Sequence, residues 1–455
     1  MGNKAARTAS ELARRIVETL RRDEYSAYLV GGCVRDLLLG REPKDFDVAT
    51  SARPDDLLRL FPRADRVGAH FGVVLVHEAE AHVEVATFRS DMEYLDGRRP
   101  VGVQFENDPR EDARRRDFTI NALLLDPLSG EVLDFVGGRG DLEARLIRAI
   151  GDPTTRFRED HLRLLRAVRF ATRLEFEIEG ATFDAIRRCA PAIRDVSAER
   201  VRDEISRILT EGAPRRGLEL LDATGLLHEI LPEVEAMKGV EQPPEFHPEG
   251  DVWVHTLMML EGLQQPSLAL ALGTLLHDVG KPGTFRVAER IRFDGHVELG
   301  VEIARRILSR LRFPNDVCDQ VEELIANHMR FKDVPKMRES TLKRFMRLPE
   351  FEEHMELHRL DCLASHGSLG SYDFVREKQR EVPPEMLKPA PLITGRDLIA
   401  AGYRPGPMFG IVLNEVEDAQ LEGRISTREQ AMEMAGQRLE HEGTEVREVT
   451  GQKPE

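Results

Sequence analysis

A short apolar run that ends in two glycines places the tightest limit on how this chain folds. Residues 26–30 read Ser-Ala-Tyr-Leu-Val and predict a strand, and the Cys-Val-Arg-Asp-Leu-Leu-Leu run that ends at Gly40 predicts a helix. Gly31 and Gly32 lie between them, where a backbone without side chains lets N–H groups approach a phosphate closely. The same pair also suits a plain strand-to-helix turn, so the motif needs a second signal.

That second signal is a pair of aspartates about a dozen residues later, at the start of a strand expected from Asp45 to Val48. Alternate side chains of a strand share a face, so Asp45 and Asp47 should point together while Phe46 packs on the other side. Adjacent like charges are costly unless a cation joins them, and oxygen ligands in an open site suit Mg²⁺. Asp45 and Asp47 are therefore the predicted catalytic, Mg²⁺-binding pair.

The hydrophobic period changes near residue 150. Period-2 segments at 73–76 and 82–88 predict further strands, whereas a 3.6-residue period follows Pro153. A chain of 455 residues is about three times the usual domain length. The sequence thus predicts an α/β head domain, a small mixed sheet with helices, followed by predominantly α-helical regions. The predicted domains are a head (1–150), a helical neck (151–238), a body (239–385) and a helical tail (386–455), with Pro-rich loops at 239–251 and 381–391 as candidate boundaries.

Composition excludes several classes of protein. No run approaches the roughly 18 apolar residues of a membrane span, so no membrane partner is expected. The four cysteines contain no CxxC spacing, which fits a reducing, cytoplasmic location. A net charge of −16 argues weakly against a polyanionic partner, but arginine is dense and lysine absent over residues 98–170. A locally basic stripe therefore remains compatible with phosphate binding.

The glycine pair followed by the two aspartates resembles the polymerase-beta-like nucleotidyltransferase superfamily. Within it, the chain resembles the bacterial-type CCA-adding tRNA nucleotidyltransferases and the related bacterial poly(A) polymerases over nearly its whole length. The resemblance implies that the 3′ hydroxyl of tRNA attacks the α-phosphate of CTP or ATP beside Mg²⁺ held by Asp45 and Asp47. It implies tRNA, CTP and ATP as partners, and leaves the oligomeric state open.

Further motifs extend the resemblance to the nucleotide. Residues 115–122 read RRDFTINA, a family segment credited with ribose and phosphate contacts; arginine forks suit phosphate oxygens, and Asp117 can accept from a ribose hydroxyl. By the same resemblance, Glu84 corresponds to a further acid that lies near the two metal-binding aspartates. The alternative is that Glu84 is a surface residue on an edge strand without a role in the site. The predicted nucleotide-binding set is Gly31, Gly32, Arg35, Arg116, Asp117, Asn121, Asp160, Arg163, Arg166 and Arg169.

Residues 159–163 match the family's EDxxR motif and bear on base choice. Asp160 and Arg163 would share one face of a helix, three residues apart. Cytosine and adenine both present an exocyclic amine beside a ring acceptor, so a carboxylate next to a guanidinium can take either base. Guanine and uracil offer a carbonyl instead, which would face the carboxylate acceptor to acceptor. The alternative is an ordinary helical salt bridge.

Two segments separate members of the family. The turn-rich residues 89–100 look like the loop needed for the terminal adenosine, which disfavours an enzyme that adds only CC. Residues 67–74 fit the tRNA-type pattern and lack the arginine-rich version found in poly(A) polymerases. An enzyme that adds only A, or a poly(A) polymerase, remains an alternative to full CCA addition.

The order of histidines and aspartates in the body resembles the HD superfamily of metal-dependent phosphohydrolases. Imidazole with carboxylate binds Mn²⁺, Ni²⁺ or another transition metal better than Mg²⁺ alone. The resemblance implies 2′,3′-cyclic or 3′-terminal RNA phosphates as substrates. Two other readings are a phosphohydrolase whose head merely grips RNA, and an RNA-binding scaffold without chemistry. The predicted metal ligands are His255, His277, Asp278, His296, His328 and Asp361.

Two tail segments, 393–399 and 402–407, look like the part of the family that cradles the tRNA elbow. The helix after them offers Val412 and Val416 for packing. A purely structural role for these segments is the alternative.

Overall fold

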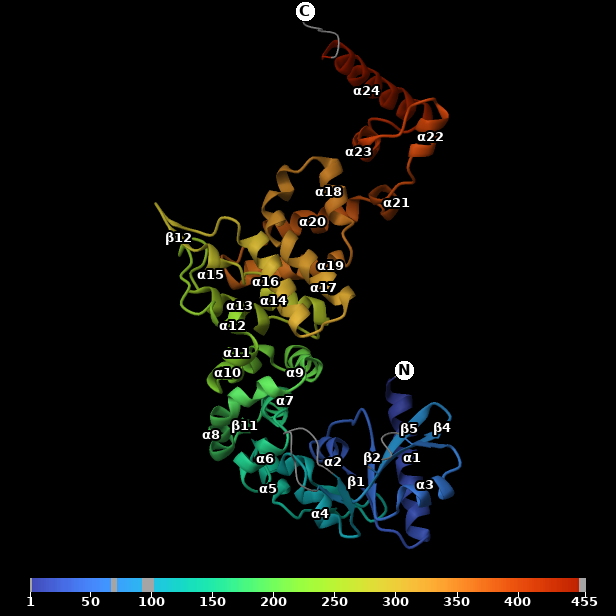
Figure 1. Ribbon diagram of the computed structural model, residues 1–455, viewed down its shortest axis with the longest axis vertical. Helices are drawn as coiled ribbons and strands as arrows, with labels where there is room; N and C mark the ends of the chain where they lie inside the picture. The colour runs from blue at the N-terminus through green and yellow to red at the C-terminus, as the bar shows by residue number, and fades with distance from the viewer. Residues whose placement is uncertain (1, 67–71, 92–101, 450–455) are drawn as a thin grey trace, which may run out of the picture.

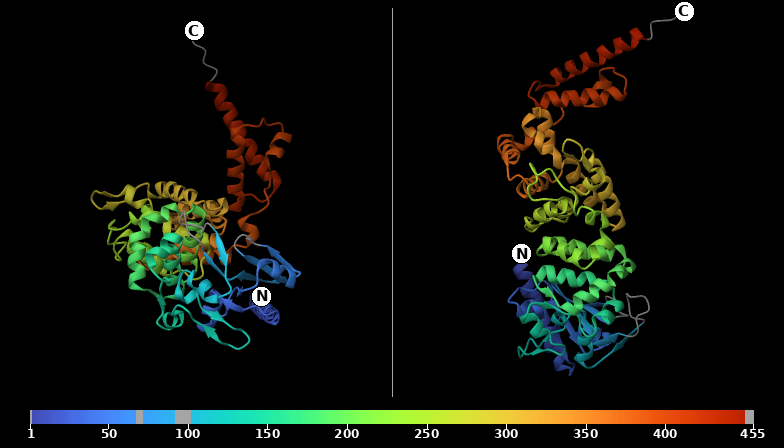
Figure 2. Two further views of the ribbon diagram at one scale, coloured as in Figure 1. Left: turned by 60° about the horizontal axis from the view of Figure 1, so that its bottom comes forward. Right: turned by 90° about the vertical axis from the view of Figure 1, so that its left-hand side faces the viewer.

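The computed structural model describes residues 2–66, 72–91 and 102–449 of an elongated molecule (Figure 1). The head lies at one end, and the neck, body and tail follow in chain order along the long axis, as the side view in Figure 2 also shows. The mixed sheet with helices and the helical remainder confirm the predicted fold class. Among the described residues, no helix has both the length and the apolar character needed to cross a membrane.

The head is built on a seven-stranded sheet in the order β3-β4-β5-β2-β1-β8-β9. Strand β2 pairs antiparallel with β1, where Val30 faces Asp47, and parallel with β5, where Asp47 faces Glu84. The end of β1, the start of β2 and the middle of β5 therefore lie side by side. The elements of the head are α1 (Gly2–Arg22), β1 (Ala27–Val30), α2 (Gly32–Leu38), β2 (Asp47–Thr50), α3 (Pro54–Leu60), β3 (Ala64–Arg66), β4 (Val73–Glu78), β5 (Ala81–Thr87), β6 (Arg89–Asp91), β7 (Val103–Phe105), α4 (Pro109–Arg114), the 3-10 helix η2 (Thr119–Asn121), β8 (Leu124–Leu125), β9 (Val132–Leu133), α5 (Gly138–Glu143) and β10 (Leu146–Ile147).

Helix α1 covers one face of this sheet. Its apolar residues recur every three or four positions, so Leu12, Ile16 and Leu20 form one buried stripe. They belong to the same core as Val48 and Val85 from the two central strands. The predicted strands are confirmed with one shift, because β2 begins at Asp47 and not at Asp45.

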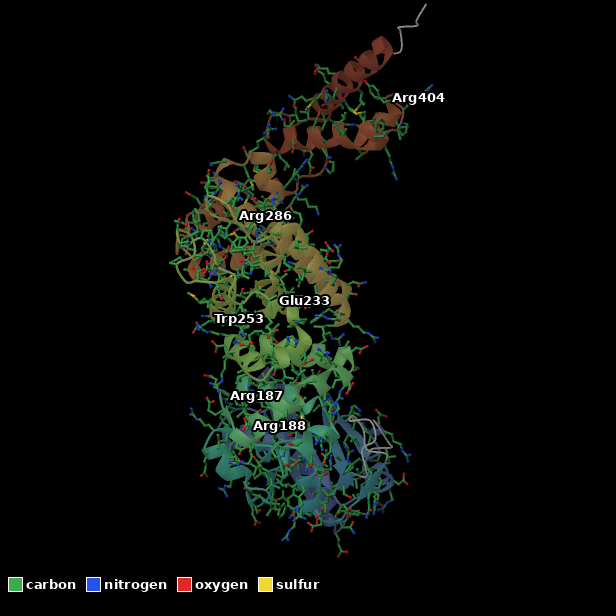
Figure 3. All side chains as sticks on the ribbon, turned by 60° about the vertical axis from the view of Figure 1, so that its left-hand side comes forward. Arg187, Arg188, Glu233, Trp253, Arg286 and Arg404 are labelled. Atoms are coloured by element: carbon green, nitrogen blue, oxygen red, sulfur yellow. The ribbon has the colours of Figure 1, made fainter. Side chains whose placement is uncertain are left out.

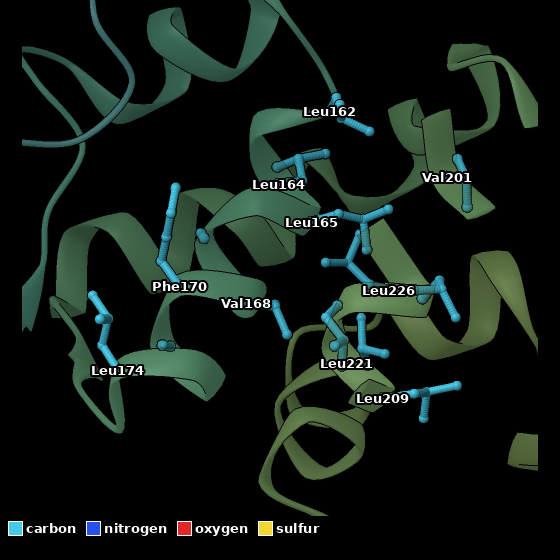
Figure 4. Close-up of a cluster of buried hydrophobic side chains, with 14 of the residues drawn as sticks. Leu162, Leu164, Leu165, Val168, Phe170, Leu174, Val201, Leu209, Leu221 and Leu226 are labelled. Atoms are coloured by element: carbon cyan, nitrogen blue, oxygen red, sulfur yellow. The ribbon is translucent and has the colours of Figure 1, made fainter. Parts of the chain in front are cut away.

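The neck packs around α7, whose buried Leu164, Leu165 and Val168 meet residues of α9, α10 and α11, such as Leu209, Leu221 and Leu226, in the cluster of Figure 4. Close approach of α9 and α10 depends on Gly217, where an added Cβ would lie 2.5 Å from Ile208 Cγ2. The elements of the neck are α6 (Pro153–Glu159), α7 (Arg163–Leu174), β11 (Glu177–Ile178), α8 (Gly180–Cys189), η3 (Ala190–Asp195), α9 (Ala198–Thr210), α10 (Pro214–Ala223), α11 (Leu226–Ile230) and α12 (Pro232–Glu235).

The body is a helical bundle in which α14 packs against α17 and α13 against α19. Figure 3 places Trp253 of α13 between the neck and the projecting β12–β13 hairpin, which carries Arg286. The elements of the body are α13 (Val252–Glu261), α14 (Leu268–Leu276), α15 (Lys281–Thr284), β12 (Arg286–Val287), β13 (Ile291–Arg292), α16 (His296–Arg310), α17 (Asn315–Asn327), η4 (His328–Lys336), α18 (Glu339–Met346), α19 (Phe351–Ala364) and α20 (Gly370–Glu381).

The tail forms its own small core from three helices. Val412 and Val416 are buried there, as predicted, against Leu398 and Ala431. The tail helices are α22 (Gly395–Ala400), α23 (Pro407–Leu421) and α24 (Arg428–Val449), and a short helix, α21 (Pro384–Leu387), crosses the predicted boundary between body and tail.

Two buried histidines on α19 make the body sensitive to acid. His354 is 1% exposed, and neither of its ring nitrogens has a hydrogen-bond partner among the described residues. His358 stacks on Phe331 with ring centroids 4.4 Å apart. Burial lowers the pKa of each ring to about 4, and Arg330 contributes in the case of His354.

His354→Phe should therefore reduce acid destabilisation. The pKa of His354 falls from 6.5 to about 4 on folding. The stabilising contribution of the buried, neutral ring to the free energy of unfolding is therefore fully present above pH 6.5 and is lost as the pH falls towards 4. We expect a loss of about 2 kcal/mol at pH 5 that the phenylalanine variant does not suffer. Thermal unfolding at pH 7.5 and 5.0 measures it. The exposed His366→Phe is the control, and equal pH sensitivity of wild type and His354→Phe would contradict the prediction.

Candidate functional site

The turn between β1 and α2 opens directly onto the acidic residues of the head. Gly31 has a φ of 75°, a conformation that side chains disfavour. An added Cβ there would lie 3.3 Å from Arg116 Nη1 and 3.7 Å from Asp47 Oδ2. The glycine therefore lies beside one arginine and one aspartate of the predicted site, as a phosphate cradle next to a metal requires.

Three carboxylates of the head repel one another. Burial, together with the neighbouring carboxylates of Glu84 and Asp45, raises the pKa of Asp47 to about 6 against the opposing effect of Arg116. Glu84 comes from β5, which lies between β4 and β2, so it is not on an edge strand, although its side chain is exposed as that alternative expects. A divalent cation would relieve this repulsion, and the donors are the hard oxygens that Mg²⁺ prefers, so the residues fit a metal of that kind.

Asp45 reaches this cluster by a different route from the one predicted. It lies in a bend before β2, exposed, so strand alternation does not direct its carboxylate. Phe46 is buried in the main core, as predicted. The chain bends because the strand ladder between β1 and β2 ends at the pair of Val30 and Asp47.

Arg116 is held next to the glycine turn by a buried acid. Asp112 is 1% exposed and pairs with Arg116 at 3.0 Å and with Arg115 at 2.6 Å. Arg116 also donates to the carbonyl oxygen of Asn121 at 3.3 Å. Asp112 was not predicted, although the run of arginines after it is a signal that an acid must orient them.

A buried polar chain links α2 to the neck. Arg35 is paired with Asp36 and donates to Asn121 Oδ1 at 2.6 Å, and Asn121 Nδ2 donates to Asp117 at 3.1 Å. Asp117 pairs in turn with Arg166 of α7 at 2.6 Å. Although burial opposes it, Arg166 and Asn121 hold the pKa of Asp117 below its usual range. Four predicted nucleotide-binding residues thus lie in one network.

Phe170 is surrounded by predicted arginines. The guanidinium groups of Arg35, Arg166 and Arg169 lie over its ring at 5.3, 5.2 and 4.5 Å from the centroid. Arg169 is also paired with the buried Glu204 at 2.8 Å, and burial lowers its pKa to about 10 despite that partner. These contacts fix the arginines between head and neck.

The helical geometry predicted for Asp160 and Arg163 is wrong. Asp160 follows the end of α6 with φ −146° and ψ 106°, whereas Arg163 begins α7. The Asp160 side chain accepts the backbone N–H of Leu162 at 3.1 Å, which favours a turn over a continuous helix. Asp160 pairs with Arg200 at 2.8 Å and Arg163 with Glu159 at 2.5 Å, so they are not paired with each other.

The predicted ligands of the body come together as two adjoining triplets. The ligand atoms of His255, His277 and Asp361 lie within 4.8 Å of one another, and so do those of a second triplet. That second triplet is Asp278, His296 and His328. The Nε2 atoms of all four histidines are buried without a hydrogen bond of normal geometry among the described residues. Such a set of buried imidazole and carboxylate groups fits a transition-metal centre.

The opposite ring nitrogens are anchored in a way that orients these imidazoles. In His277, His296 and His328, Nδ1 lies 2.9, 2.8 and 2.6 Å from the carbonyl oxygen three residues earlier. In His255 it lies 2.7 Å from Glu249. With Nδ1 donating, Nε2 is the ring nitrogen that faces the centre, and a metal would take the place of any proton on it, the usual arrangement of metal-binding histidines.

The glycine of the HDxGK string has a steric role. A Cβ on Gly280 would lie 2.1 Å from the carbonyl oxygen of His296 and 2.6 Å from the backbone nitrogen of Gly300. Only glycine therefore allows the start of α16 to approach the end of α14, which brings His296 to Asp278.

The loop at 239–251, predicted only as a boundary, also supplies residues to this centre. Glu249 binds His255 and lies 2.8 Å from His247 Nδ1. Burial lowers the pKa of His255, but interactions with Asp361 and Glu249 outweigh it and raise the value to about 9. The acidic, proline-rich composition of the loop at 239–251 gave no signal that it supplies residues to this centre.

Comparison with known proteins covers the same regions. A family described as "Poly A polymerase head domain" matches residues 27–148, one described as "Probable RNA and SrmB- binding site of polymerase A" matches 175–238, and "HD domain" matches 251–364. The CCA-adding enzyme of Levilactobacillus brevis is 33% identical over 427 residues, which is 93% of this chain and 96% of that protein. The chain belongs to the CCA-adding enzyme family. The predicted resemblance is confirmed.

Further CCA-adding enzymes are also similar to this chain over nearly its whole length. The CCA-adding enzyme of Streptococcus mutans is 31% identical over 92% of this chain and 94% of its own length. The structure of the Bacillus stearothermophilus CCA-adding enzyme in complex with CTP is 27% identical, with a TM-score of 0.73, covering 95% of this chain and 98% of that one. The Thermotoga maritima CCA-adding enzyme complexed with tRNA, 20% identical with a TM-score of 0.60 over 94% and 95% of the two chains, shares the fold.

Membership of the family confirms that the chain is a nucleotidyltransferase. The head and HD families, together with the side-chain clusters, indicate dependence on divalent metals. The roles of individual site residues stay predictions. Residues 67–71 and 92–100, which bear on the choice among family members, lie outside the described residues. The strands on either side of the second segment, β6 and β7, pair with Arg89 opposite Phe105.

Asp47→Asn should make the metal-free head more stable at neutral pH. The folded protein raises the pKa of this carboxyl from 3.8 to about 6, so the ionised form costs stability at pH 7, and this cost declines as the pH falls from about 6 towards 3.8. Because Asp47 is only partly buried, we expect a gain of about 1–2 kcal/mol.

Thermal unfolding in EDTA at pH 7 and pH 5 measures this gain. Glu80→Gln is the control, since that carboxylate is exposed in the turn between β4 and β5 and is not among the groups that raise the pKa of Asp47. Destabilisation by Asp47→Asn at pH 7 would contradict the proposed repulsion.

Proposed function

We propose that this chain adds CCA to the 3′ end of tRNA from CTP and ATP, with the acidic cluster of the head as its catalytic site. The observation that carries the proposal is the juxtaposition of Gly31, Asp47 and Glu84 in a member of the CCA-adding enzyme family. In the reaction, the 3′ oxygen of tRNA bonds to the α-phosphorus while the bond to pyrophosphate breaks, and the hydroxyl proton is released.

Asp45 and Asp47 are the residues that would hold Mg²⁺, with Glu84 beside them. Bound divalent ions would activate the attacking hydroxyl and stabilise the departing pyrophosphate. The backbone at Gly31 and Gly32 leaves room for the triphosphate. Arg116, whose Nη1 would lie 3.3 Å from a Cβ added to Gly31, supplies a guanidinium to the phosphate oxygens.

Base choice rests on Asp160 and Arg163, whose partners set their orientation. Arg200 holds the Asp160 carboxylate, and Glu159 holds the Arg163 guanidinium. Asp160 then accepts the exocyclic amine of cytosine or adenine, and Arg163 donates to the neighbouring ring acceptor. Uracil and guanine place a carbonyl opposite the carboxylate.

Asp160→Ala should therefore lose discrimination against UTP. Without the carboxylate, the acceptor that repels the uracil carbonyl is gone, so we expect the kcat/KM ratio of CTP over UTP to fall about ten- to a hundredfold. Single-nucleotide incorporation into tRNA lacking its 3′ CCA measures the ratio. Asp184→Ala, an exposed acid on α8, is the control. An unchanged ratio in Asp160→Ala would refute the proposed base template.

Full CCA addition is distinguished from its alternatives by which tRNA 3′ ends the protein extends and with which nucleotides. Purified protein is given tRNAs that end before the first C, after one C and after CC, with each labelled nucleotide. Completion of all three supports full CCA addition, addition to the CC end alone identifies an A-adding enzyme, and long A tails identify a poly(A) polymerase.

For the body we propose a second activity, metal-dependent hydrolysis of RNA-terminal phosphates. Its support is the convergence of four buried Nε2 atoms on Asp278 and Asp361, with His277 Nε2 3.1 Å from Asp278 and His255 Nε2 3.2 Å from Asp361. Mn²⁺ or Ni²⁺ is the proposed metal, and a bound ion of this kind supplies an activated water as nucleophile. We also propose a division of labour at 1–150, 151–238, 239–385 and 386–455, with the tail contacting tRNA.

The two centres should be separable by substitution. Asp45→Ala removes a proposed head ligand and should abolish nucleotide addition while sparing phosphate release. His277→Ala should do the reverse, because its Nε2 faces only the body centre. Both activities are measured on the same two proteins. A scaffold without chemistry would show neither activity in the wild type, so neither substitution would change any turnover. Phosphate release without addition in the wild type would favour a phosphohydrolase that grips RNA.

A further inference from the structure

We infer that Gln242 and Lys281 form a phosphate-binding subsite on one side of the body's metal centre. The inference rests on the phosphohydrolase function proposed above and names the residues that recognise its substrate. The ligand class is a phosphate ester with a free anionic oxygen.

Lys281 places a buried cation against the predicted metal ligands. It is 7% exposed, and its Nζ lies 2.6 Å from Asp278 Oδ2. The same Nζ donates to Gln242 Oε1 at 2.6 Å, and it lies 5.3 Å from the centroid of the Phe293 ring. The ammonium group is therefore fixed at the edge of the centre by two acceptors and an aromatic face.

Gln242 adds a donor that has nothing to bind. Its side chain is 4% exposed, and its Nε2 has no hydrogen-bond partner among the described residues. The orientation of the amide is decided by Lys281, because an ammonium can pair only with the amide oxygen. The NH₂ group is thus the one left unpaired, and a buried donor without a partner is costly unless a ligand accepts from it.

The two donor groups are joined by their own hydrogen bond and lie next to Asp278. An anion that reaches the centre can accept from Gln242 Nε2 and gain the field of the Lys281 ammonium. A phosphate ester suits this arrangement because it offers several oxygens, so one can meet these donors while others face the metal ligands. Neither donor belongs to the six predicted metal ligands, which leaves them available for substrate.

The chain holds Gln242 in place through the loop at 239–251. An isolated bridge pairs Glu241 with Asp251, and Val252 donates to the carbonyl oxygen of Val240 at 3.0 Å. The same loop brings Glu249 to His255. One loop therefore orients a histidine and supplies the donor for phosphate.

Inorganic phosphate is the probe, titrated calorimetrically into the full-length, Mn²⁺-loaded protein, and every protein compared, including the one with the wild-type body, carries Asp45→Ala and Asp47→Ala so that the head contributes no metal site. Gln242→Leu is expected to weaken phosphate binding about ten- to a hundredfold without changing the Mn²⁺ content, because it removes one donor to a charged group. Gln320→Leu is the matched control: it removes another buried, unpartnered amide nitrogen, on α17, and should bind phosphate like the wild type. Lys281→Arg should retain binding that Lys281→Met loses.

The outcomes separate this inference from the function beneath it. Mn²⁺ uptake measured by elemental analysis, with phosphate binding by Gln242→Leu within twofold of the wild type, overturns the subsite alone. Mn²⁺ uptake without any phosphate binding by the wild type also overturns it. A wild type that takes up no Mn²⁺ overturns the phosphohydrolase function and the subsite together.

Discussion

Repulsion among three carboxylates is the constraint on which the head depends. The parallel register of β2 and β5 sets Asp47 opposite Glu84, and the bend before β2 brings Asp45 into range. Strand pairing supplies the force that holds these charges together, so the sheet stores an unfavourable interaction that a divalent cation can relieve. Gly31 beside them keeps the space open.

The body also brings together groups that can hold a metal, but it uses histidines with two carboxylates where the head uses carboxylates alone. Its histidines are anchored at Nδ1 by backbone carbonyls or Glu249, and their Nε2 atoms converge on two carboxylates. Between the two centres, the neck is tied to the head by buried ion pairs such as Asp117 with Arg166. The arginines proposed for nucleotide recognition are therefore also the ones that pack the head against the neck, so we expect changes at Arg166 or Arg169 to alter head–neck packing as well as any nucleotide binding.

Local patterns in the sequence were sufficient wherever a short motif carries its own geometry. The glycine turn, the strands around it and the six body ligands were predicted because each depends on residue type and spacing. Prediction failed for Asp160 and Arg163, since the EDxxR spacing suits one helix but the Asp160 side chain caps Leu162 and breaks it. Gln242 was missed because its role arises from a contact with Lys281, 39 positions along the chain, for which periodicity gives no signal. Asp112 and Glu249 contact residues close to them in the sequence, but they lie outside the motifs that were recognised.

The most direct test of the central claim is a crystal structure of the chain with Mn²⁺ and a CTP analogue that cannot be cleaved at its α-phosphate. The anomalous signal of manganese locates the ion independently of the protein density. We expect a peak bound by Asp45 and Asp47, with the triphosphate against the backbone at Gly31. Manganese away from Asp47, or a triphosphate bound elsewhere, would contradict the proposed catalytic site.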